Sequence, residues 1–104
     1  MADLVKFKGV KVELGGEIYV VPPLTLGALE QLQDDIAKMN GNTAFNEQVN
    51  VISKVGLAAL QRNYPEMTRE KLLEIVDVSN MNELFEAVMD VSGLKRKAQE
   101  EAGN

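Results

Sequence analysis

Alternation of apolar and polar residues marks the start of the chain as β structure. Residues 10–14 alternate aliphatic with charged side chains, and residues 18–21 are rich in β-branched side chains. Gly15-Gly16 lies between these two runs, and a glycine pair is typical of a tight hairpin turn. The pattern predicts a β-hairpin within residues 5–21. Pro22-Pro23 ends its second strand, because proline cannot donate to a strand ladder.

Two loop lengths fit this hairpin, and they place different side chains together. A loop of two residues pairs Val12 with Tyr19, whereas a loop of three residues, 15–17, pairs Val12 with Val20. We favour the longer loop because it gathers the aliphatic side chains of both strands on one face. Tyr19 and Val21 then lie on the opposite face, although glycine would be preferred at the last position of such a loop.

Downstream of the hairpin, apolar residues recur at the three- and four-residue steps of amphipathic helices. Four helices are predicted to begin at the caps Thr25, Thr43, Thr68 and Asn80, the last with Glu83 at the capping-box position. The apolar stripe of the first helix consists of Leu26, Leu29, Leu32, Ile36 and Met39. Gly56, inside the second predicted helix, indicates that a neighbouring backbone approaches closely there.

The predicted fold class is α+β, with an N-terminal β-hairpin followed by a bundle of about four short helices. Residues 1–93 are predicted to form a single domain, because a chain of 104 residues is the size of one domain. Residues 94–104 contain one large apolar side chain and can bury little surface. We therefore expect them to form a flexible polar tail.

The composition argues against several classes of function. The chain has no cysteine and no histidine, so it lacks thiolate metal ligands and the commonest general base. No motif frames its carboxylates for acid–base catalysis, and we expect a protein that is not an enzyme and needs no cofactor or metal. A formal net charge of −5 disfavours nucleic-acid binding. The absence of a long apolar run or a signal peptide predicts no membrane contact and a cytoplasmic location.

The remaining candidates for a functional surface are apolar. Asp34-Asp35 is a carboxylate doublet, but adjacent helical residues point about 100° apart and do not converge on one ion. The methionines on the helical stripes either fill the core or form an adaptable binding surface. The candidate partner-binding residues from the hairpin face and the stripes are Tyr19, Val21, Met39, Met81, Phe85 and Met89.

Residues 15–29 read GGEIYVVPPLTLGAL, with a second strand that runs into Pro-Pro-Leu-Thr-Leu-Gly and then a helix. This segment resembles the N-terminal signature of the tail assembly chaperones of long-tailed bacteriophages and prophages. A looser similarity continues through Tyr64-Pro65-Glu66 and Asp77 to the end of the last helix near Gly93. The resemblance covers about 85 residues, but its specificity lies in residues 15–29.

The resemblance implies a non-enzymatic role in virion morphogenesis. Chaperones of this family bind the tape measure protein, help to recruit tail tube subunits, and are absent from the mature virion. We therefore expect both proteins as partners, a homo-oligomer, and a location in the cytoplasm of the bacterial host. Two alternatives remain open. One is another morphogenesis component, such as a tail-completion or connector protein; the other is a small transcriptional regulator, which the acidity of the last two predicted helices disfavours.

Overall fold

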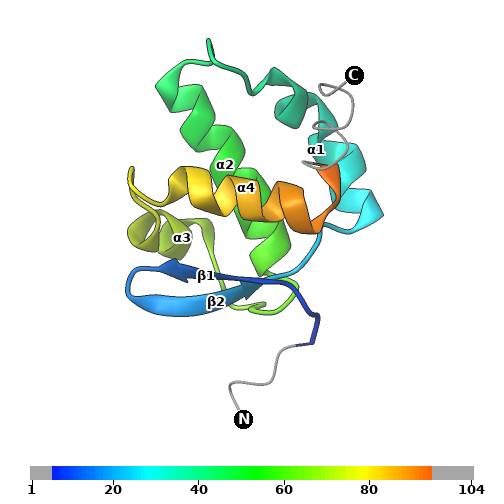
Figure 1. Cartoon of the computed structure of the whole chain (residues 1–104), viewed down its shortest axis with the longest axis vertical. Coiled ribbons are helices and arrows are strands. Elements are labelled where there is room, and N and C mark those ends of the chain that lie inside the picture. Colours follow the sequence, from blue (N-terminus) through cyan, green and yellow to red (C-terminus); the bar gives the residue numbers. More distant parts are fainter. Residues whose placement is uncertain (1–5, 95–104) are drawn as a thin grey trace.

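Two strands and four helices follow one another along residues 6–94, the part of the chain that the computed structural model describes (Figure 1). They are β1 (Val10–Leu14), β2 (Glu17–Val21), α1 (Leu26–Lys38), α2 (Phe45–Leu60), α3 (Arg69–Ile75) and α4 (Met81–Val91). This order confirms the predicted α+β class, with an N-terminal hairpin followed by four helices. The predicted tail lies outside the described residues, apart from Leu94.

The hairpin turns through two residues, so the predicted loop of three residues is wrong. Both residues of Gly15-Gly16 have positive φ angles, 60° and 86°, and this turn pairs Val12 with Tyr19. A tight turn with positive φ at both central positions favours glycine strongly, and this preference decides the register. Tyr19 and Val21 consequently lie on the buried face beside Val12, while Ile18 is 60% exposed.

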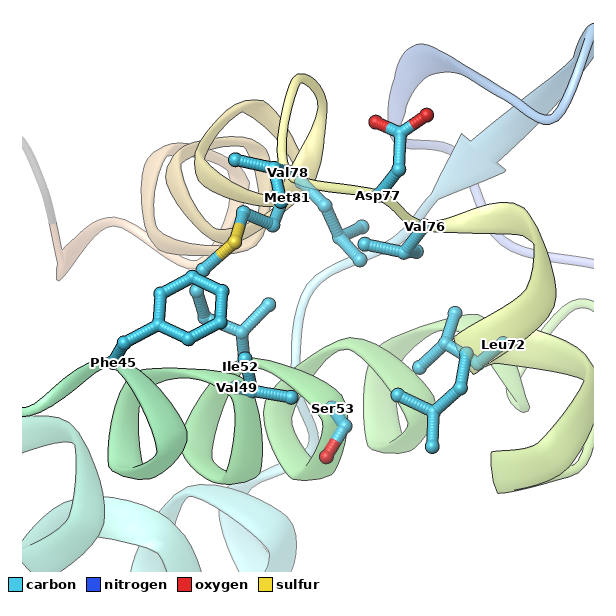
Figure 2. Close-up of a pocket in the computed structure, with 11 residues that line it drawn as sticks. Phe45, Val49, Ile52, Ser53, Leu72, Val76, Asp77, Val78 and Met81 are labelled. Carbon is cyan, nitrogen blue, oxygen red and sulfur yellow. The ribbon is translucent and has the colours of Figure 1, made fainter.

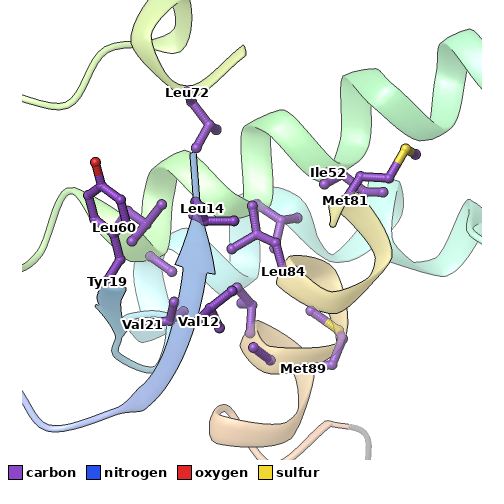
Figure 3. Close-up of a cluster of buried hydrophobic side chains, with 14 of the residues drawn as sticks. Val12, Leu14, Tyr19, Val21, Ile52, Leu60, Leu72, Met81, Leu84 and Met89 are labelled. Carbon is purple, nitrogen blue, oxygen red and sulfur yellow. The ribbon is translucent and has the colours of Figure 1, made fainter. Parts of the chain in front are cut away.

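The buried face of the hairpin packs on the helices to form the core. Figure 3 shows Val12 and Leu14 of β1 pointing toward Leu84 of α4. The largest fully buried side chains come from the hairpin, α2, α3 and α4, and they include Leu14, Val21, Val51, Val55, Leu60, Leu72, Leu84 and Val88. Burial of these side chains is the main source of stability of the fold.

α1 lies at the periphery of this core. It has no fully buried residue, and Leu29, Leu32, Ile36 and Met39 pack against the core only in part. Leu26 does not join them, because it is 84% exposed at the first turn. The polar contacts of α1 with α2 lie further along the helix, where Lys54 reaches Asp35 at 3.3 Å.

Three helices begin at the predicted cap residues, two of them with a side-chain hydrogen bond, and α2 begins one residue later than predicted. The side-chain oxygens of Thr25 and Thr68 accept hydrogen bonds from the backbone N–H groups three residues later, at 3.1 Å each. Thr43 instead donates to the carbonyl of Lys38, and α2 starts after Ala44. Asn80 precedes α4 but makes no side-chain cap, because its amide bonds the preceding connection.

Gly56 marks a close approach, as predicted, but the neighbour is a side chain rather than a backbone. A Cβ atom at Gly56 would stand 2.8 Å from Cδ2 of Leu84. The glycine therefore lets α4 pack tightly across α2, at the centre of the core.

The segment after α2 fastens the hairpin from its outer side. The Asn63 side chain accepts from Phe7 N at 2.8 Å and donates to the carbonyl oxygens of Phe7 and Val20, at 2.9 and 3.2 Å. The Tyr64 hydroxyl accepts from Val20 N at 2.8 Å. The guanidinium of Arg62 lies 3.9 Å from the centroid of the Phe7 ring, in cation–π contact. On β2, these contacts occupy the outward backbone groups of Val20.

Among residues 6–94, none of the helices combines the length and apolarity that a bilayer-spanning segment requires.

Candidate protein-binding groove

Three helices border an apolar groove with a volume of about 210 Å³ (Figure 2). Its walls come from α2, the end of α3, the α3–α4 connection and the start of α4. We call it the α2–α3–α4 groove, and it is lined by Phe45, Val49, Ile52, Ser53, Leu72, Leu73, Val76, Asp77, Val78, Met81 and Leu84.

The groove has a buried floor and an exposed apolar rim. Ile52 and Leu84 belong to the core and are 2% and 0% exposed. On the rim, Phe45, Leu73 and Val78 are 57%, 41% and 72% exposed. Single exposed apolar residues are common on soluble proteins, but three around one hollow mark a surface suited to binding.

A hydrogen-bonded turn holds the α3–α4 connection and presents Val78 at the rim. Oδ1 of Asp77 accepts from the backbone N and the hydroxyl of Ser79, at 2.9 and 2.6 Å, and from Asn80 N at 3.1 Å. In the opposite direction, the backbone N–H of Asp77 donates a hydrogen bond to Oδ1 of Asn80 at 2.8 Å. The hydroxyl bond from Ser79, followed by the backbone bonds, lowers the pKa of the Asp77 carboxyl.

The polar groups of the groove are satisfied within the protein and do not face its interior. The Ser53 hydroxyl donates to the carbonyl oxygen of Asn50 at 2.9 Å. The carboxylate of Asp77 points away from the apolar side chains in Figure 2. The groove therefore offers apolar contact and shape, which suit the apolar face of an amphipathic helix.

The structure brings only one of the six candidate binding residues to this groove. Met81 lines it and is 5% exposed. Tyr19, Val21 and Met89 lie in the core, so their side chains offer no free surface in this fold. Val21 is completely buried because the two-residue turn directs it toward the helices. Burial of Tyr19, followed by the nearby Glu17 charge, raises the pKa of its hydroxyl.

The other two candidates, Met39 and Phe85, are half-buried and do not line the groove. Sequence reasoning did not select the rim residues. Phe45 carried a signal, because it begins the apolar stripe of α2. Val78 carried a weaker one, since it is a β-branched apolar residue between Asp77 and Ser79, outside any helix.

Within residues 6–94, no group of three or more carboxylate side chains is arranged to hold a metal ion. The chain matches no protein-family model, no curated protein and no solved structure.

Proposed function

We propose that this protein is a non-enzymatic tail assembly chaperone of a long-tailed phage or prophage. In this proposal it binds the tape measure protein in the α2–α3–α4 groove and helps to recruit tail tube subunits. It acts as a homo-oligomer in the host cytoplasm and is absent from the mature virion.

The observation that carries the proposal is the exposed apolar rim of Phe45, Leu73 and Val78 around an apolar groove. Such a surface fits a helix that presents apolar residues three and four positions apart. The resemblance of residues 15–29 to the chaperone signature supports the tape measure protein as the source of that helix. A long helical partner would offer many such faces, so weak contacts by many copies add up along it.

The test is co-expression with the tape measure protein encoded in the same phage or prophage genome. The measurements are the soluble fraction of the tape measure protein and the amount of this chain that co-purifies with it. Val78→Asp places a charge on the rim and is expected to weaken binding about thirtyfold, the loss that corresponds to an interface hot spot of about 2 kcal/mol. Leu26→Asp is the matched control, because Leu26 is 84% exposed on α1 and does not line the groove.

Equal co-purification of Val78→Asp and the parent chain would refute the groove as the binding site. Failure of the parent chain to bind the tape measure protein at all would refute the proposed partner. Mass spectrometry of purified virions separates this role from that of a tail-completion or connector protein, which would remain in the particle.

A further inference from the structure

The two edges of the hairpin differ in how their backbone groups are used. Val20 pairs with Lys11 across the sheet, and the N–H and C=O of Val20 point outward, where Tyr64 and Asn63 bind them. Residues opposite each other in an antiparallel pair either both exchange hydrogen bonds or both point away. The backbone groups of Lys11, and by the same alternation those of Glu13, therefore point outward from β1.

These four groups of β1 have no partner in the described part of the chain. No hydrogen bond joins the N–H or C=O of Lys11 or Glu13 to any residue of 6–94. The side chains of both residues are exposed. β1 is thus an open edge with donors and acceptors at the spacing that an added strand requires.

A hollow lies beside this open edge. Neighbouring strands are about 4.8 Å apart, whereas packed helices are about 8–10 Å apart, so two strands are narrower than the two helices that cover them. α2 and α4 both pack on the sheet, and of the two strands α4 contacts β1 more than β2 (Figure 1). Between β1 and α4 is an open depression of about 410 Å³. It is lined by residues 10–12 of β1 and by Asn82, Glu83, Glu86, Ala87 and Asp90 of α4.

We propose that β1 accepts a third strand, supplied by an extended segment of a partner protein that carries Lys or Arg at alternate positions. The backbone of the segment would pair with Lys11 and Glu13. One set of its side chains would point to the same side as Val12, toward α4. This surface is distinct from the α2–α3–α4 groove and does not depend on the function proposed for it.

The charge of α4 selects basic residues for that set. Glu83 and Asp90 are seven residues apart, about 10.5 Å along the helix axis, with Glu86 between them. Two residues four positions apart on an extended strand are about 13 Å apart, so their side chains can approach Glu83 and Asp90. Among residues 6–94, Lys11 is the one basic residue lining the depression, and neither Glu83 nor Asp90 forms an ion pair.

The probe is a fluorescently labelled eight-residue peptide that alternates lysine with threonine, added to the full chain at low salt. The matched peptide has glutamate in place of lysine. We expect the lysine peptide alone to bind, with about fivefold weaker binding to the double variant Glu83→Gln/Asp90→Asn because two charge pairs are lost. Val78→Asp, on the other surface, is expected to leave peptide binding unchanged.

Backbone pairing has its own signature. Amide hydrogen exchange at Lys11 and Glu13 is expected to slow about tenfold at saturating peptide, because their N–H groups gain acceptors. Lys11→Pro removes one outward donor and no bond to β2, and it is expected to abolish binding. Lys11→Ala, which loses the same side chain but keeps the N–H, is expected to bind at least as well as the parent chain.

Binding without slower exchange at Lys11 and Glu13 would overturn the proposal, since the peptide would then be held by charge alone. Equal binding of both peptides would overturn its chemistry. Self-association of the full chain that Lys11→Pro abolishes would assign the edge to a second copy instead. Binding by residues 1–94 but not by the full chain would assign it to the tail. Exchange and the glutamate peptide decide the question even if Lys11→Pro fails to fold.

Discussion

At the scale of single residues, Gly9 is the position where the backbone leaves no room for a side chain. A Cβ atom at Gly9 would overlap the carbonyl oxygen of Val21 and stand 2.8 Å from Cα of Pro22. Because these atoms of Val21 and Pro22 belong to the backbone, they cannot move aside without distorting the chain. We expect Gly9→Ala to lower the free energy of unfolding by about 1–3 kcal/mol, measured by urea denaturation.

The matched control is Gly27→Ala in α1, where a Cβ would meet no atom within 4 Å. That change is expected to raise the free energy of unfolding by about 0.5–1 kcal/mol, because alanine favours the helix. If both substitutions had the same effect, the close approach at Gly9 would not exist.

The hydrogen bonds to the Asp77 carboxylate predict that the free energy of unfolding depends on pH in the acid range. Hydrogen bonds from Ser79 lower its folded-state pKa below the ordinary 3.8. The folded state therefore favours the carboxylate, and the resulting stabilisation is present above pH 3.8 and lost as the pH falls through the lower, folded-state pKa. We expect the difference in unfolding free energy between the parent chain and Asp77→Ala to shrink in that range. A difference that stays constant from pH 6 to pH 2 would contradict the hydrogen-bonded turn.

At the scale of elements, the sequence predicted the existence of each helix and strand better than their orientation. Thr25 and Thr68 each precede an apolar residue of the helical stripe by four positions, Leu29 and Leu72, so their caps were predictable. The register of the hairpin was not, because Ile18, Tyr19, Val20 and Val21 are all apolar. A strand with this composition has no alternation to show which face is buried. The turn decided the question, and its preference for glycine was the stronger signal in the sequence.

The attachment of β2 to the end of α2 depends on contacts more than forty residues apart. Tyr64 bonds Val20 N, and its ring stacks edge-on against Tyr19 with centroids 5.2 Å apart. We expect Tyr64→Phe, which keeps the ring and loses the hydroxyl, to lower the free energy of unfolding by about 1 kcal/mol. Asn46→Ala, on the exposed side of α2, is a control that should change it by a few tenths of a kcal/mol. An unchanged midpoint for Tyr64→Phe would show that water replaces the hydroxyl without cost.

At the scale of the whole molecule, the groove illustrates what periodicity leaves undetermined. The sequence shows that the stripe containing Phe45, Val49 and Ile52 is apolar. It does not show which helix covers this stripe. The structure places α3, the α3–α4 connection and α4 around it, and together they leave a gap at the start of α2. The exposure of Phe45 is therefore a property of tertiary packing. Met89 is likewise an apolar residue of a helical stripe, but the packing of α4 places it in the core.

The peripheral position of α1 predicts that the molecule opens there first. α1 buries no residue completely, and its ion pairs with α2 involve Lys54 and Lys38, whose side chains are 47% and 57% exposed. Exposed pairs contribute little, so few interactions oppose local unfolding of this helix. We expect native-state hydrogen exchange to give smaller opening free energies for α1 than for α2 and α4.

A pair of truncations tests the same difference. Leu84 is completely buried between α2 and the hairpin, so Leu84→Ala should lower the free energy of unfolding of the protein by about 2–5 kcal/mol. Leu29 is half-buried on α1, and Leu29→Ala should lower the free energy of unfolding by about 1 kcal/mol, since part of this side chain already faces water. In Leu29→Ala, the amides of α1 should exchange faster while those of α2 barely change, because the helix opens without the rest of the core. If α1 instead exchanged only with global unfolding, in step with α2, it would be an integral part of the core, and the ranking of the two leucines would lose its basis.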